Sequence, residues 1–408
     1  MMPGSQQAEP MPLHKRLSLG MLSLLIATAI WLPCLHLFFA GDTAQFFQDE
    51  GVPPQARRLA QRHITLWTDP ESREREIARM RTANAEWDFM GRTFLVAALG
   101  NLALRDPASR GECLEVMDRV IAETLRLEQK EGLYFFLMPY ARSGSWVEKP
   151  PRSLFIDGEI ALMLAVRRIV EERAEYRTLL TERVEIMIAR MEQSPVLSAE
   201  SYPNECWTFC NTVSLAAIRL ADYLDGTDHS EFLDAWVERA KEKLVDPKTG
   251  LLVSSYTVDG LHLDGPEGSS IWMACHCLRV VDGDFAADQY RRARKELGRT
   301  VFGFGYAREW PASWVNPQDV DSGPVVPILG ASPGASGLAF LGAATFKDKR
   351  YLSALLTSLQ FAGLPSTRRG GLRYCASNQV GDAVLLYATL QGPVWKMVAE
   401  GRVHGEAR

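Results

Sequence analysis

The chain has 408 residues, of which 47% are hydrophobic and 23% charged, so it can bury a large core and is neither disordered nor fibrous. Its 45 basic and 50 acidic residues leave a net charge of −5. Nucleic acid is therefore not an expected partner, because its binding depends on basic surfaces that release counterions from phosphates. Length alone allows one to three domains.

The start of the chain is predicted to anchor it in a membrane. Residues 1–16 form a polar tail that ends in His14, Lys15 and Arg16, and residues 17–40 form an uncharged apolar run. As a helix this run is about 36 Å long, enough to cross a bilayer. The basic flank favours a cytoplasmic tail and a remainder on the exported, periplasmic or extracytoplasmic side. A cleaved signal peptide is the alternative, which the length of the run and the lack of a clear cleavage site disfavour.

After a linker at 41–54, helical periodicity dominates residues 55–400, and two types of helix alternate. One type is amphipathic with a charged face, as in Glu112–Ile121. The other is apolar or small on nearly every side, which suits an interior position. Six helices of the second type are predicted, at 89–104, 160–170, 213–224, 271–281, 335–346 and 383–390. Paired with outer helices, they predict one all-α domain, an (α/α)6 barrel, with an open solenoid as the alternative.

In such a ring the inner helices run parallel, so that their N-termini converge on one mouth. Acidic, aromatic, amide and cysteine side chains gather at these six helix openings, at 87–88, 157–159, 205–211, 264–268, 319–324 and 374–378. Aromatic walls with a few polar groups are the general form of a small-molecule site. The alternative is structural, since Asp88 and Asp157 could cap helices and the tryptophans could belong to the core.

The densest opening contains Glu205, Cys206 and Cys210. Cysteines four apart would share one helical face near the helix N-terminus, where the macrodipole favours thiolate over thiol. Glu205 could act there as an acid or a base. The alternative is that the cysteines are small buried hydrophobes or members of a structural disulfide.

Seven cysteines are an odd number and define no disulfide framework, although export would allow pairs such as Cys275 with Cys277. His276 lies between those two cysteines and is either a catalytic candidate or a satisfied core histidine. A zinc site there is not expected, because neighbouring residues on a helix point in different directions. We expect no metal and no cofactor.

The apolar N-terminus, the predicted barrel, the stretch Glu86–Phe94 and the cysteine-bearing start of the third inner helix together resemble the linalool dehydratase-isomerase family. The resemblance covers about residues 55–395. It implies cofactor-free acid–base chemistry on a small apolar alcohol or alkene in an exported barrel. It also implies a catalytic aspartate at Asp88 and cysteines that best match Cys206 and Cys210, with His276 as the histidine candidate.

Two departures from the family pattern suggest a relative with a different substrate, or one that no longer acts on linalool. Phe94 replaces the tyrosine that the family has after its aspartate, and the two cysteines are closely spaced.

The function predicted is a lyase or isomerase of the hydratase-dehydratase type, bound to the bilayer through residues 17–40. A homo-oligomer is compatible with the sequence. The candidate catalytic residues are Asp88, Glu205, Cys206, Cys210 and His276. The candidate substrate-binding residues are Trp87, Phe94, Asp157, Tyr202, Trp207, Asp321 and Tyr374. The alternative is a glycoside hydrolase or polysaccharide lyase that uses Asp157, Glu205 and Asp321 as paired carboxylates. A non-catalytic scaffold is a third, less favoured hypothesis.

Overall fold

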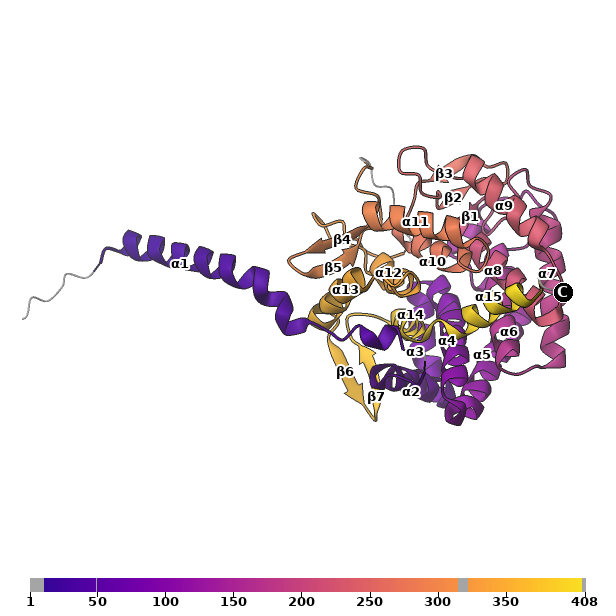
Figure 1. Ribbon diagram of the computed structural model, residues 1–408, viewed down its shortest axis with the longest axis horizontal. Helices are drawn as coiled ribbons and strands as arrows, with labels where there is room; N and C mark the ends of the chain where they lie inside the picture. The colour runs from indigo at the N-terminus through magenta and orange to yellow at the C-terminus, as the bar shows by residue number, and fades with distance from the viewer. Residues whose placement is uncertain (1–10, 49, 315–321, 406–408) are drawn as a thin grey trace, which may run out of the picture.

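The computed structural model describes residues 11–48, 50–314 and 322–405, and Figure 1 shows a rounded body of helices with one helix projecting from it. Six helices form the inner ring: α4 (Ala85–Arg105), α6 (Leu154–Val170), α8 (Thr208–Asp225), α10 (Gly268–Leu278), α12 (Pro333–Thr345) and α14 (Gln379–Leu390). Each inner helix contacts the next one, and α14 contacts α4. The ring is therefore closed, so the predicted (α/α)6 barrel is confirmed and the open solenoid is wrong.

The outer helices alternate with the inner ones along the chain. They are α2 (Pro54–Thr68), α3 (Pro70–Ala83), α5 (Arg110–Glu131), α7 (Ala174–Met191), α9 (Ser230–Lys243), α11 (Gly283–Glu296) and α13 (Lys349–Ala362). Helix α5, for example, buries Val116, Val120 and Ile121 and leaves its charged face outside. Inner helix α6 is instead buried at every residue. The two helix types thus occupy the two layers that their sequences predict.

Short antiparallel strands connect the helices at the end where the inner helices begin. β1 (Cys206–Trp207), β2 (Ser255–Tyr256) and β3 (His262–Asp264) form one sheet, with Cys206 opposite Tyr256. β4 (Gly298–Val301) pairs with β5 (Phe304–Ala307), and β6 (Pro365–Arg368) pairs with β7 (Gly371–Tyr374). β1 leads directly into α8, and β7 comes shortly before α14, so these strands border the mouth of the ring.

The opposite end of the ring is closed by the C-terminal helix α15 (Pro393–Gly405), which contacts α4 and α8. Trp395 of this helix stacks on His276, with 4.6 Å between ring centroids, and its indole N–H donates to the His276 carbonyl. The Val394 N–H donates to the Asn101 side chain at 3.1 Å. One end of the barrel is thus packed, which leaves the other end for a site.

The projecting helix is α1 (Leu13–Cys34), none of whose residues is buried. Among the described residues, the stretch Leu13–Phe39 is the one helical segment long and apolar enough to cross a membrane, and both an anchor and a signal sequence have these properties. Residues 41–48 follow it and pack on the barrel. Phe46 of η2 (Ala44–Phe46) is buried and stacks on Phe340 of α12 at 6.0 Å.

Candidate active site

A cavity of about 690 Å³ lies where the inner helices begin, and its volume falls within the ~300–1,000 Å³ usual for small-molecule sites. Most of its wall is apolar or aromatic, and includes Met90, Phe155, Phe209, Phe340, Leu338, Leu359 and Val384. Four carboxyl side chains interrupt this wall: Glu86, Glu267, Glu309 and Asp382. The cavity can therefore hold an apolar molecule and present it to a few acidic groups.

Helix α4 supplies one side of the cavity through Glu86, Trp87, Met90 and Phe94. The helix begins here because the Asn84 side chain caps it, accepting from the N–H groups of Glu86 and Trp87. Residues 87, 90 and 94 are three and four apart, so they form one stripe that faces the ring axis. The predicted substrate-binding residues Trp87 and Phe94 thus line the cavity.

A short hydrogen bond joins two polar groups of the cavity wall. The Tyr202 hydroxyl donates to Glu86 Oε1 at 2.5 Å and accepts from the Met138 N–H at 2.9 Å. Burial, and then the neighbouring Glu86 charge, raise the pKa of Tyr202. Tyr202 therefore keeps its proton and holds the Glu86 carboxylate in one orientation.

Cys210, in the first turn of α8, also lines the cavity. Burial raises its pKa well above the usual range for a thiol, and the nearby Glu159 and Glu86 charges act in the same direction. The macrodipole was expected to favour a thiolate here, which is wrong, because loss of hydration and two neighbouring acids outweigh it. Cys210 is therefore a neutral thiol at neutral pH.

Cys206 was expected on the same helical face as Cys210, which is also wrong. It lies in β1, before α8 begins, and is fully buried outside the cavity wall. Burial and the Glu148 and Glu200 charges raise its pKa as well. All seven cysteines are unpaired.

Two buried acids near the cavity have strongly raised pKa values. Burial raises the pKa of Asp382, in the first turn of α14, to about 7, and hydrogen bonds from the Tyr374 N–H at 3.2 and 3.4 Å oppose this only in part. Burial also raises the pKa of Glu159, on α6, to about 8, although the Thr93 hydroxyl beside it lowers the value slightly. Near neutral pH, Asp382 is divided between its acid and base forms, and Glu159 is mostly protonated.

Tyr374 and Glu309 complete the polar part of the wall. The Tyr374 hydroxyl accepts from the Gln55 amide at 2.6 Å, and burial raises the pKa of Tyr374 to about 12. Glu309 Oε1 accepts from the N–H and hydroxyl of Ser269 at 3.0 and 2.5 Å, and Oε2 accepts from the Ser322 hydroxyl at 3.1 Å. Glu309 thus joins the start of α10 to Ser322, in the segment that precedes α12.

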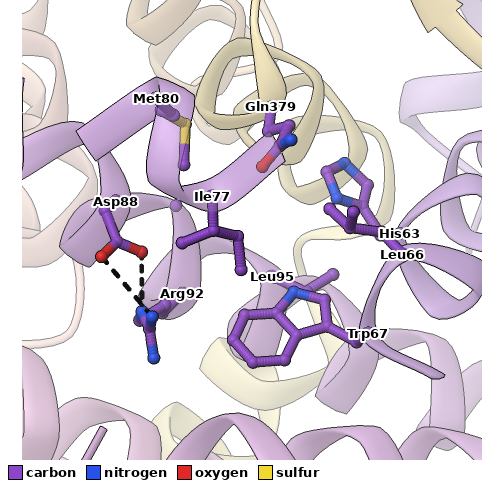
Figure 2. Close-up of a pocket in the computed structure, with 10 residues that line it drawn as sticks. His63, Leu66, Trp67, Ile77, Met80, Asp88, Arg92, Leu95 and Gln379 are labelled. Carbon is purple, nitrogen blue, oxygen red and sulfur yellow. Dashed lines mark hydrogen bonds and ion pairs between the residues drawn. The ribbon is translucent and has the colours of Figure 1, made fainter. Parts of the chain in front are cut away.

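Asp88 lies outside the cavity, in a crevice of about 10 Å³ between α4 and its outer neighbours (Figure 2). Its Oδ1 pairs with the Arg92 Nε at 2.8 Å, and its Oδ2 lies 3.6 Å from an Arg81 nitrogen. Arg92 is itself held by the Thr124 hydroxyl at 3.2 Å. Asp88 therefore serves the packing of α4, and we leave it out of the proposed site.

Asp157 and Glu205 also lie off the cavity wall. Both oxygens of Asp157 accept from Arg152, at 2.5 and 2.7 Å, and Oδ1 also accepts from Arg183 at 2.6 Å. Glu205 Oε2 accepts from the indole N–H of Trp207 at 3.1 Å. Trp207 itself lines the cavity, so Glu205 lies just behind the wall. Asp321 falls outside the described residues.

His276 lies towards the closed end of the ring. Its Nδ1 is 2.7 Å from the Thr345 hydroxyl, and its Nε2 is 2.7 Å from the Tyr387 hydroxyl. Because the Thr345 hydroxyl already donates to the Leu341 carbonyl, Nδ1 donates and Nε2 accepts. Burial lowers the pKa of His276 to about 3, so the ring is neutral and both its nitrogens are used in packing.

The structure thus brings six of the predicted residues to one cavity: Trp87, Phe94, Tyr202, Trp207, Cys210 and Tyr374. The four cavity carboxyls were not among the predicted site residues. A usable signal was position, because Glu86, Glu267 and Asp382 each lie within the first turn or at the N-cap of an inner helix. Among the described residues, no three His, Cys, Asp or Glu side chains are placed to share a metal ion.

Comparison with known proteins gives no match among curated sequences. Several solved structures are similar in shape at low identity. A GH76 α-mannanase from Bacteroides thetaiotaomicron is 14% identical with a TM-score of 0.47, covering 76% of this chain and 87% of its own. The unsaturated glucuronyl hydrolase from Bacillus sp. GL1 is 13% identical with a TM-score of 0.46, and the match covers 73% of this chain and 85% of the hydrolase. The GH76A α-1,6-mannanase from Salegentibacter sp. HEL1_6 is 14% identical with a TM-score of 0.49, and the match covers 75% of this chain and 89% of the mannanase.

A family comparison is more specific than these likenesses of shape. The family model described as linalool dehydratase/isomerase matches residues 159–380, from α6 to the first turn of α14. This stretch is more than half of the 408-residue chain and contains Cys210, Glu267 and Glu309 of the cavity wall. The protein therefore belongs to the linalool dehydratase/isomerase family.

Proposed function

We propose that the protein is a cofactor-free lyase or isomerase that removes water from, or adds it to, a small apolar alcohol or alkene. The observation that carries the proposal is an apolar cavity whose wall holds both a hydrogen-bonded Glu86–Tyr202 pair and Asp382, a carboxyl group with a pKa of about 7. Dehydration needs an acid for the leaving hydroxyl and a base for a proton on a neighbouring carbon. The cavity wall contains a candidate acid, Asp382, and a candidate base, Glu86.

In the proposed reaction, protonated Asp382 gives its proton to the substrate hydroxyl, and the C–O bond breaks to release water. Glu86, held by the Tyr202 hydroxyl, takes a proton from the adjacent carbon, and that C–H electron pair forms the new double bond. Exchange with water then returns a proton to Asp382 and removes one from Glu86. Addition of water to the other end of an allylic system would give an isomeric alcohol by the reverse steps.

Cys210 has a different proposed role from that of a nucleophile. Its thiol is neutral and lines the cavity next to apolar side chains. A neutral thiol is a small, nearly apolar group and a weak hydrogen-bond donor, so it can contact either the alkene or the hydroxyl group of a substrate. We assign Cys210 to substrate contact, with the acid–base steps left to Asp382 and Glu86.

The test is turnover of linalool by the full-length chain in detergent, followed by gas chromatography of hydrocarbon and isomeric alcohol products. Glu86→Gln and Asp382→Asn are each expected to lower kcat by about 100-fold or more, because a positioned acid or base contributes about that much. The matched control is Glu175→Gln on the outside of α7, whose side chain is 65% exposed, and it should leave kcat unchanged. Full turnover in both cavity variants would contradict the proposal.

A glycoside hydrolase or polysaccharide lyase is the second candidate, and one observation favours it. Four carboxyl side chains and two tryptophans, Trp87 and Trp207, share one cavity wall. The pair would be drawn from the cavity carboxyls, because Asp157 is held by arginines outside the cavity. Release of reducing sugar from a mannan or an unsaturated glucuronide, with no product from linalool, would favour this candidate over the first.

A further inference from the structure

The apolar N-terminal stretch ends directly on the barrel, with no free chain between them. After α1, the residues of η1 (Leu35–Phe39) lie on α13. The Phe39 ring meets Phe361 edge to face, with 5.0 Å between centroids, and Gly41 packs against the Leu356 side chain. A bilayer crossed by residues 17–40 would therefore lie against this side of the barrel.

The same side exposes a group of apolar side chains that we call the apolar rim. Its members are 44% to 70% exposed and are Leu37, Phe38, Val301, Phe302, Phe361 and Leu364. Contacts place three chain segments of the rim together. Phe304 of β5 lies 5.2 Å from the Phe361 ring, and Gly303 in the β4–β5 turn lies against the His36 ring. Figure 1 shows α13 and the β4–β5 hairpin on the side from which α1 leaves.

Two rim residues occupy backbone positions that disfavour them. Phe302 has a φ of 47° in the β4–β5 turn, and Leu364 has a φ of 52° after α13. Bulky residues are uncommon in this left-handed region, where glycine or asparagine is usual. The needs of a turn do not explain why Phe and Leu occupy these positions. Core packing does not explain it either, because both side chains are exposed. A contact with an apolar phase outside the protein would account for both.

The rim and the cavity share two structural elements. On α13, Phe361 belongs to the rim, and Leu355 and Leu359 line the cavity. On the β4–β5 hairpin, Phe302 belongs to the rim, and Tyr306 lines the cavity. The cavity therefore lies one layer of structure behind the rim.

We propose that the apolar rim lies in the interfacial region of the bilayer that residues 17–40 cross, and that the cavity receives its substrate from that bilayer. Phe and Leu are typical of apolar faces that enter the interfacial region, and here Phe38, Phe302 and Phe361 lie near the end of the span. A second protein on the rim would have to accommodate the emerging helix, whereas a bilayer already contains it. The substrate part rests on the proposed function, and its chemistry is that of an apolar alcohol that partitions into lipid.

The test measures the depth of the rim in phosphatidylcholine vesicles that carry the full-length chain. In a background with Cys34→Ser and Cys375→Ser, which removes the two exposed cysteines, a nitroxide is placed on Phe302→Cys. The control nitroxide is on Glu175→Cys, on α7, which Figure 1 places on the side away from α1. The ratio of collisions with oxygen to collisions with a water-soluble nickel chelate is expected to be severalfold higher at 302 than at 175.

Equal ratios at both positions, or a chain that does not bind the vesicles, would overturn the proposal. If Phe302→Cys does not fold, Leu364→Cys gives the same readout from the second segment of the rim. Linalool turnover is measured separately in detergent, so a failure of the proposed chemistry leaves the depth measurement intact. The nitroxide at 302 could lie in lipid while turnover does not rise when linalool is supplied in vesicles. That result would contradict the entry of substrate from the bilayer and leave the position of the rim supported.

Discussion

Helix α4 borders two spaces that differ greatly in size and in the groups that contact their acidic side chains. One face of the helix lines the crevice of about 10 Å³ in Figure 2, where Asp88 is paired with Arg92. The neighbouring face lines the cavity of about 690 Å³, where Glu86 accepts from Tyr202. Two acids only two residues apart therefore have different surroundings, because each residue turns the helix by about 100°.

These surroundings distinguish the acids that are available for chemistry from those that serve packing. Asp88 directs its two oxygens at the side chains of Arg92 and Arg81, so it contributes to the packing of α4 and does not face the cavity. A carboxyl that meets hydroxyl groups or backbone N–H groups in an apolar wall can exchange a proton with a bound molecule. Substitutions and pH titration of these groups test this contrast.

Asp88→Asn should cause the largest loss of stability, about 3 kcal/mol, because it removes the closer of the two acidic partners of the buried Arg92 and leaves Glu123 at 3.3 Å. Thermal unfolding in detergent measures the loss. Glu115→Gln is the control, since it removes an exposed acid that is likewise four residues from an arginine, Arg119, and should cost less than about 1 kcal/mol. Equal effects of the two substitutions would mean that the crevice does not hold Asp88 as described.

The crevice should also lose stability in acid through His63. Burial, and then the Arg62 charge, lower the pKa of His63 from 6.5 to about 3. Between these values the unfolded chain binds the proton that the folded chain excludes, so stability falls as pH decreases, by up to about 1.4 kcal/mol for each pH unit. His63→Gln should flatten this part of a stability–pH curve, and an unchanged slope would contradict the neutral buried ring.

The cavity should show the opposite dependence on pH. Because burial raises the pKa of Asp382 from 3.8 to about 7, the folded chain keeps a proton that the unfolded chain releases. Stability therefore falls as pH rises through this interval, again by up to about 1.4 kcal/mol for each unit. Asp382→Asn should remove that slope. In the unsubstituted protein, turnover should also fall above about pH 7, when the proposed acid loses its proton; a constant rate up to pH 9 would argue against that role.

The smallest effect is expected at Cys210, where the raised pKa leaves little thiolate at pH 7.5. Iodoacetamide should modify the exposed Cys375 rapidly and leave Cys210 largely unmodified, with no change in stability. Mass spectrometry of peptides from the labelled protein measures both positions. Modification of Cys210 at the rate of Cys375 would indicate a reactive thiolate in the cavity.

The sequence predicted the barrel well because its signal is local. Helices such as α6 and α8 are apolar or small on most sides, and this property depends only on residues close together in the chain. The mouth was also predictable as a region, since Trp87, Tyr202 and Cys210 were expected there and line the cavity. The acids predicted as site residues, Asp88, Asp157 and Glu205, lie off its wall, and their roles in catalysis or binding stay predictions.

Local sequence patterns were enough to predict one apolar N-terminal helix, six inner helices and the end of the ring where polar groups gather. Three features depend on packing between distant segments: α14 meets α4 to close the ring, α15 covers the end near His276, and Glu86 rather than Asp88 faces the cavity. The physical reason lies in the inner helices themselves. A helix that is buried on all sides has no polar face to indicate its rotation, so the packing of its neighbours determines which side chains point to the axis.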